Sequence, residues 1–166
     1  LDGWSRRILS KPMDRDGAFA ASGRLQTGLL ALLLRDPYFS QPAPKSTGPE
    51  YFSPDWLQRH LAAFGEIAPA DVQATLLALT THSIADSIRR QSASRQPEVF
   101  VCGGGAHNIA LMRSLSANLP GAVVGPTDNL GVPVDWVEAM AFAWLARQRW
   151  HEKAGNCPLV TGATRP

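Results

Sequence analysis

The 166-residue sequence has few of the features that place a chain among membrane-spanning or disulfide-rich proteins. It contains only two cysteines, Cys102 and Cys157, which lack the paired spacing of a zinc site or a disulfide framework. Its longest apolar stretch, residues 29–34, is much shorter than the roughly 20 residues that cross a bilayer, and no charged-then-apolar leader opens the chain. We therefore expect a soluble, cytoplasmic protein with no membrane partner.

Neither positive nor negative charge is in large excess. Charged residues make up 18% of the chain and the formal net charge is +2, so no nucleic-acid partner is expected. Apolar residues make up 45%, which suffices for one core. The composition predicts one domain, or a large part of one, with a small molecule or another protein as partner. Because the chain opens at Leu1 inside a helical pattern, we expect a piece of a longer polypeptide.

Apolar residues at helical spacing dominate the first half of the chain. They predict helices over residues 1–9, 18–35, 53–64 and 69–90, the second of them interrupted by Gly23 and Gly28, which suggest close packing. The change to a proline-rich composition predicts an extended loop over residues 36–55.

The second half has the alternation of a βαβ unit over residues 98–125. A β-branched run at 98–102, a helical pattern at 108–119 and a second short run at 122–125 predict parallel strands with a right-handed crossover. Two strands alone leave both outer edges unpaired, so further strands are expected from outside the chain. A last helix over residues 134–150 is expected to bury one apolar stripe, and residues 155–166 form an irregular tail.

Gly103, Gly104 and Gly105 lie between a predicted strand and a predicted helix. Such a turn lets a ligand approach the backbone closely, and amides at a helix N-terminus favour phosphate oxygens. The later glycine of the dinucleotide-binding fingerprint is absent. Two interpretations fit the local pattern equally well. One is a nucleotide site, and the other is a tight turn that binds nothing.

Glu138 is the second candidate, because residues 139–146 carry no charge on any side of the helix. A carboxylate just before that stretch is expected to face the interior or a cavity. Asp135 and Glu138 also have the spacing of a capping box, in which the glutamate only bonds the N-cap amide. The pattern alone favours the capping box.

Four other residues are weaker candidates. Lys45 lacks the context of a Walker loop, so a solvated lysine is the better interpretation. His82 and His107 have no second ligand nearby in sequence, and no metal site is predicted. Asp128 lies in a turn-forming segment, where turn chemistry is the default.

Three motifs together resemble the C-terminal half of the anhydro-N-acetylmuramic acid kinase family. They are residues 101–108 (VCGGGAHN), 127–131 (TDNLG) and 135–143 (DWVEAMAFA). Their order and spacing make the resemblance specific, and matches at the segments 2–4, 16–23, 44–48, 50–52 and 161–163 extend it over nearly the whole chain.

This resemblance implies an α/β fold, a ribonuclease-H-like domain of the sugar kinase, Hsp70 and actin superfold. The domain is helix-rich and truncated at its N-terminal side, so residues 1–166 are an incomplete second kinase domain. The family's enzyme opens the 1,6-anhydro bridge of anhydro-N-acetylmuramic acid with water and phosphorylates O6 with ATP, which gives N-acetylmuramic acid 6-phosphate for cell-wall recycling. The implied cofactors are ATP and Mg²⁺, and the implied assembly is a homodimer.

The resemblance also implies roles for residues. Gly103, Gly104, Gly105 and Asn108 match the segment that lies against the nucleotide, which shifts the interpretation of the glycine turn toward binding. Glu138 matches an acidic position of the sugar pocket, so a substrate-binding role moves ahead of the capping box.

The chain also departs from the family pattern. Pro49 stands where a basic residue is expected, which weakens any ligand role for that loop. The family's phosphate-binding glycine loop and aspartate base are expected upstream of Leu1, in a missing N-terminal kinase domain. No catalytic residue is therefore expected within this chain, and the chain alone is expected to be inactive.

Two alternatives stay open on the sequence. One is a non-catalytic nucleotide-binding or interaction module derived from such a kinase by truncation. The other is an ATP-dependent enzyme of the same superfold that acts on a different small substrate, because a fold does not fix a function.

Overall fold

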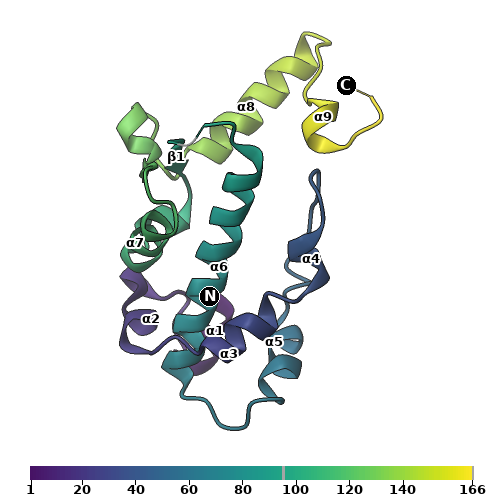
Figure 1. Ribbon diagram of the computed structural model, residues 1–166. Coiled ribbons are helices and arrows are strands. Elements are labelled where there is room, and N and C mark those ends of the chain that lie inside the picture. Colours follow the sequence, from purple (N-terminus) through teal and green to yellow (C-terminus); the bar gives the residue numbers. More distant parts are fainter. Residues whose placement is uncertain (95, 166) are drawn as a thin grey trace.

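A computed structural model describes residues 1–94 and 96–165 and shows a helix-rich α/β arrangement (Figure 1). Short 3₁₀ helices, η1 (Arg15–Gly17), η2 (Gly104–His107) and η3 (Thr127–Leu130), lie before α2, before α7 and after β2. No helix within the described ranges is both long enough and apolar enough to span a membrane. The helices and strands are α1 (Asp2–Leu9), α2 (Ala18–Ser22), α3 (Thr27–Leu33), α4 (Pro37–Ser40), α5 (Pro54–Leu61), α6 (Pro69–Gln91), β1 (Glu98–Val101), α7 (Ile109–Asn118), β2 (Val123–Pro126), α8 (Val137–Trp150) and α9 (Pro158–Thr161).

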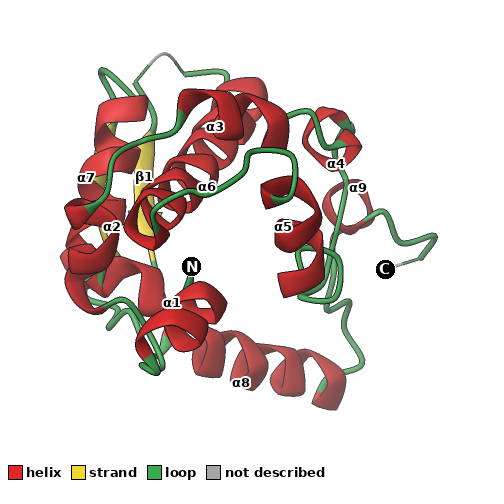
Figure 2. Ribbon diagram, turned by 90° about the horizontal axis from the view of Figure 1, so that it is seen from below, coloured by secondary structure: helices red, strands yellow, loops and turns green. Residues whose placement is uncertain are grey.

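The 23-residue helix α6 is the axis of the structure (Figures 1 and 2). It begins with Pro69, whose fixed φ suits the first helical position, and ends near Arg89 and Arg90, whose charges suit the C-terminal dipole. It packs against α2, α3 and α7. In both views α7 and β1 lie on one side of α6 and α5 lies on the other, so α6 separates the sheet from the main core.

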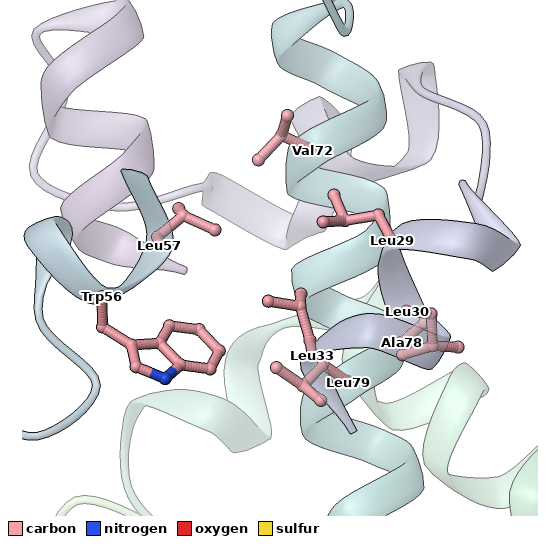
Figure 3. Close-up of a cluster of buried hydrophobic side chains, with 8 residues drawn as sticks. All are labelled: Leu29, Leu30, Leu33, Trp56, Leu57, Val72, Ala78 and Leu79. Carbon is pink, nitrogen blue, oxygen red and sulfur yellow. The ribbon is translucent and has the colours of Figure 1, made fainter. Parts of the chain in front are cut away.

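Leucines of α3 form the main core together with α5 and α6 (Figure 3). Leu29 and Leu33 are fully buried, and Trp56 and Leu57 of α5 belong to the same cluster. Burying a leucine side chain completely stabilises a fold by roughly 1.5–3 kcal/mol. The cluster is completed by Leu30, Val72, Ala78 and Leu79.

Strands β1 and β2 form a parallel sheet in which Val99 lies opposite Val124. Helix α7 connects them, and its Leu115 packs with Leu119 and with Ala85 of α6. No third strand pairs with this sheet within residues 1–94 and 96–165. The predicted α/β class, helix-rich with a small parallel sheet, is therefore confirmed, whereas the ribonuclease-H-like superfold stays a prediction.

The interruption predicted at Gly23 within residues 18–35 is confirmed, because α2 and α3 are separate helices, whereas the interruption predicted at Gly28 is wrong, because Gly28 lies inside α3. Gly23 is extended, with φ −98° and ψ 174°, and a Cβ there would lie 2.0 Å from the carbonyl oxygen of Ala70. The close packing suggested by Gly23 is present. The amide of Gln26 donates to Thr75 Oγ1 of α6 at 3.1 Å. A side chain of α6 thus accepts a hydrogen bond from an amide that, in a continuous helix, would donate to a carbonyl of the same helix.

Two segments predicted to be irregular each contain a short helix. Within residues 36–55, α4 begins at Pro37 and is capped by the carboxylate of Asp36. Within residues 155–166, α9 begins at Pro158. Proline favours the first position of a helix, and the high density of prolines obscured that signal in the sequence.

The buried stripe predicted for the last helix is also wrong. Met140 is 50% exposed and Trp144 is 48% exposed, and α8 has no buried side chain among its residues. Figure 1 shows α8 projecting from the body that contains α6 and α7. A helix that is apolar on all sides is normally buried. Burial of α8 therefore requires a surface that the described residues do not provide.

Candidate functional site

The glycine turn after β1 exposes its backbone. Gly103 adopts φ 70° and ψ −169°, which favours glycine, and its amide donates to the carbonyl of Val134 at 2.8 Å. A Cβ built on Gly103, Gly104 or Gly105 would have no heavy atom within 4 Å. A ligand can therefore approach this backbone without displacing a side chain.

Asn108 connects the glycine turn to a second segment, η1. Its Oδ1 caps α7 by accepting the amide of Leu111 at 2.9 Å. A Cβ on Gly17 would lie 2.4 Å from both Asn108 Oδ1 and Ala110 Cβ, and the φ of Gly17 is +74°. Only glycine allows this approach. Because the cap uses the oxygen of Asn108, its Nδ2 group is the donor that remains for a ligand.

Asp14 anchors the loop that contains η1. It is 7% exposed, and its carboxylate accepts the amides of Phe19 and Ala20 at 2.8 and 2.9 Å. The side-chain amide of Gln73 donates to the same carboxylate at 3.1 Å and to Ser5 Oγ at 3.2 Å. Hydrogen bonds to a charged group contribute about 1.5–3 kcal/mol each. This buried network holds residues 13–17 in place.

The glycine turn and residues 13–16 of the loop line one cavity of about 820 Å³. This volume lies within the range of small-molecule sites, about 300–1,000 Å³. The cavity brings together three of the predicted nucleotide-binding residues, Gly104, Gly105 and Asn108. Gly103 lies at the base of the turn and is not part of the lining. The other lining residues are Leu1, Asp2, Met13, Asp14, Arg15, Asp16, Thr80, His107 and Leu111.

A smaller cavity of about 360 Å³ lies between α1, α5 and α6. Its lining includes the aromatic side chains of Trp4, Phe52 and Trp56 and none of the predicted site residues. The glycine-turn cavity is therefore the one that fits the sequence prediction.

Glu138 lies outside both cavities, in the first turn of α8. The predicted burial of its side chain is wrong, because Glu138 is exposed. The capping box is absent as well, since Trp136 is the N-cap of α8 and no side chain caps this helix. Asp135 instead pairs with His107 Nε2 at 3.1 Å. This exposed contact connects the start of α8 to the glycine turn.

Lys45 is not the solvated side chain that the sequence predicted. It is half-buried and donates to the carbonyls of Tyr38 and Phe39 at 2.8 and 3.3 Å. Its ammonium also lies 4.6 Å from the centre of the Tyr38 ring, a favourable cation–π distance. The positive charge thus satisfies carbonyls within α4, which accounts for Lys45 without a ligand.

Asp36 fastens the proline-rich loop to the core. Its carboxylate accepts the hydroxyl of Tyr51 and the indole N–H of Trp56, both at 2.8 Å, besides capping α4. Partial burial alone raises the pKa of Asp36, but the hydrogen bonds from Trp56, the Tyr38 amide and Tyr51 outweigh it and hold that pKa below its ordinary value. The same hydrogen bond to Asp36 raises the pKa of Tyr51.

The remaining candidates do not converge on one site. His82 is half-buried on α6 and lines neither cavity. Asp128 closes a turn, since its carbonyl accepts the amide of Gly131 at 2.8 Å. Cys102 and Cys157 are exposed thiols. Within the described ranges, no three His, Cys, Asp or Glu side chains group as a metal site.

The sequence did not assign Asp14 and Asp16 to this cavity, nor Gly17 to the contact with Asn108 beside it. Asp16 has a φ of 57°, unusual for a residue other than glycine, and sits next to Gly17. The Asp-Gly pair indicates a turn, but its contact with Asn108 joins segments far apart in the chain. No local pattern predicts that contact.

The sequence model of the anhydro-N-acetylmuramic acid kinase family matches residues 1–166. Proteins named anhydro-N-acetylmuramic acid kinase are similar along almost all of this chain. The protein from Shewanella amazonensis is 53% identical over 165 residues (99% of this chain), that from Thiobacillus denitrificans 50% over 164 residues (98%), and that from Cupriavidus pinatubonensis 51% over 168 residues (100%). In each case the match spans 44% of the relative's own length. The chain thus belongs to the anhydro-N-acetylmuramic acid kinase family.

Proposed function

We propose that this chain is the nucleotide-facing part of an ATP-dependent kinase that acts on 1,6-anhydro-N-acetylmuramic acid. In the reaction, the bond between C1 and O6 of the anhydro bridge breaks, the oxygen of water bonds to C1, and the γ-phosphoryl group of ATP passes to O6. The products are N-acetylmuramic acid 6-phosphate and ADP. A cytoplasmic place in cell-wall recycling and a homodimeric assembly belong to the same proposal.

The observation that carries the proposal is the shared cavity of Gly104, Gly105 and Asn108. These residues were assigned to the nucleotide from motifs of the family, and the family match extends over the whole chain. The cavity adds an open backbone and a volume of about 820 Å³. Both properties suit ATP. Its phosphates are bound best where backbone amides are accessible, and the volume lies within the range of small-molecule sites.

Each predicted site residue has a role in this proposal. The amides of Gly104 and Gly105 face the phosphate chain, and Asn108 Nδ2 donates to the nucleotide. Gly103, whose own amide donates to the carbonyl of Val134, lets the turn bring these groups to the nucleotide. Glu138 accepts a hydroxyl of the sugar. Its exposure leaves it free to do so, and the contact between Asp135 and His107 keeps the start of α8 near the glycine turn.

The rest of the active site lies in the polypeptide outside this chain. Phosphoryl transfer depends on positioning and charge stabilisation by groups from several loops. We assign the catalytic aspartate and the phosphate-binding glycine loop to a missing N-terminal kinase domain, so the chain alone turns over nothing. Mg²⁺ enters with ATP, because this ion retains waters and substrate phosphates and needs only one or two carboxylates from protein. Among the described residues, no three His, Cys, Asp or Glu side chains lie together as a metal site.

Calorimetric titration of the 166-residue chain with ATP tests the nucleotide role. We expect saturable binding that the substitution Gly104→Glu abolishes, since a carboxylate there repels phosphate. Gly104 is exposed and has no neighbour within 4 Å of its Cβ position, so the fold tolerates the change. Ala31→Glu, on an exposed position of α3, is the matched control for charge. Absence of ATP binding, or equal binding by Gly104→Glu, contradicts the proposal.

A further inference from the structure

Helix α8 and its N-cap residue Trp136 present an uncovered apolar surface, called the α8 surface below and formed by Trp136, Met140, Phe142, Trp144, Leu145 and Trp150. We propose that this α8 surface is an interface within the whole enzyme. Its occupant is the part of the kinase polypeptide outside the 44% of the relatives' length that this chain matches. This inference rests on the proposed function, namely that the chain works as part of a longer kinase whose nucleotide lies at the glycine turn.

The exposure of the α8 surface is too large for a solvent-facing helix. Phe142 is 65% exposed and Trp150 is 85% exposed. Four of its side chains are aromatic, and at about 150 Å² each they would bury about 600 Å² on contact. This approaches the roughly 800 Å² that each partner buries in a stable interface.

The distribution of apolar residues on α8 indicates a permanent contact. No charged residue occurs between Ala139 and Ala146, on any side of the helix. A reversible docking helix keeps one polar face in water. Helix α8 has none over this stretch, so we infer that a folded partner covers it on more than one side.

The small sheet is incomplete in the same part of the molecule. The outer edges of β1 and β2 have no partner strand within the described ranges, and Val123 of β2 is an exposed apolar residue. Exposed edges of this kind are normally paired or covered. An unpaired sheet and an uncovered helix in one half of the chain call for a partner with a core of its own, such as another domain.

The position of α8 favours the rest of the kinase over an unrelated protein. The amide of Gly103 donates to the carbonyl of Val134, and His107 pairs with Asp135, both just before α8. A partner seated on α8 therefore lies next to the glycine-turn cavity. This is where the second half of a kinase active site has to be. A second copy of this chain would cover α8 but would supply none of the missing length.

Thiol reactivity tests the interface. The 166-residue chain is compared with a chimera in which the unmatched part of the Shewanella amazonensis protein is joined to it. Cys102 and Cys157, both exposed, are replaced by serine in both proteins. Phe142→Cys is then labelled with a water-soluble maleimide, Met140→Cys is a second reporter, and Leu25→Cys, at an exposed apolar position between α2 and α3, is the control.

We expect both α8 thiols to react at least tenfold more slowly in the folded chimera than in the 166-residue chain, also at concentrations low enough to dissociate any dimer, while the Leu25→Cys thiol reacts equally in both. Equal reactivity of the α8 thiols in the two proteins would overturn the proposal. So would protection that appears only at concentrations where the protein dimerises, since a second copy would then be the occupant. Phosphorylation of the anhydro sugar is measured on the same chimera. If the chimera is active but its α8 thiols react as fast as in the 166-residue chain, the interface is refuted and the proposed function is not. If the α8 thiols are protected but the chimera is inactive, the proposed function is refuted and the interface is not.

Discussion

Asp14 offers a sharp test of how the cavity is held together. Replacing it with asparagine keeps the shape of the side chain but turns one carboxylate oxygen into a donor. Either the amide of Phe19 or that of Ala20 then loses its acceptor, because each bonds a different oxygen. Gln73 can rotate its amide to compensate, since its Oε1 is buried without a partner. One unsatisfied buried donor costs about 1–3 kcal/mol, so we expect a loss of about 2 kcal/mol in unfolding free energy.

Urea denaturation followed by circular dichroism measures this loss. Asp14→Ala removes all three acceptor contacts and is expected to lower the unfolding free energy by about 4 kcal/mol. Asp16→Asn is the control in the same loop, because Asp16 is exposed and asparagine also tolerates a positive φ. It is expected to stay within about 0.5 kcal/mol of the parent chain. If Asp14→Asn were as stable as Asp16→Asn, the buried network would not be what holds residues 13–17.

Three further substitutions test other parts of the account. Gly23→Ala places a Cβ 2.0 Å from the Ala70 carbonyl, and we expect the overpacking to lower the unfolding free energy by about 1–3 kcal/mol in the same urea assay. Leu33→Ala opens a cavity at a fully buried position and is expected to cost about 2–5 kcal/mol, seen as a fall in the thermal midpoint. The pKa of Asp36 is lower in the folded state than in the unfolded state. Its ionised carboxylate therefore stabilises the fold fully above the unfolded pKa of about 3.9, and this stabilisation is lost as the pH falls through the folded-state pKa. Asp36→Asn should therefore be less stable than the parent chain at pH 7, with a difference that shrinks below about pH 4. A pH-independent difference would refute this role.

Elements whose signals are local could be predicted from the sequence. The run at residues 98–102 followed by glycine corresponds to β1, and Pro69 begins α6 as expected for a first helical residue. The glycine turn and Asn108 also follow from local order, since a cap and a turn involve only neighbouring residues.

Features that depend on distant partners could not be predicted. Gly23 indicated an interruption between α2 and α3, but not that Thr75 of α6 accepts the amide of Gln26 there. Residues 13–16 line the cavity because Asp14 reaches Gln73, and neither contact leaves a periodic signal. The exposure of Glu138 was missed for a related reason. An apolar helix predicts burial in general, but it does not say which part of the protein covers it.

Product formation by the chimera shows whether this chain supplies the nucleotide-facing part of an active kinase. The folded chimera is incubated with ATP, Mg²⁺ and 1,6-anhydro-N-acetylmuramic acid, and the sugar product is identified by mass spectrometry, with the 166-residue chain alone in parallel. We predict N-acetylmuramic acid 6-phosphate and ADP from the chimera, neither from the chain alone, and loss of product when Gly104→Glu is introduced. A folded chimera that binds ATP but forms no phosphorylated sugar, or a product made by the chain alone, would contradict the claim that this chain is the nucleotide-facing part of such a kinase.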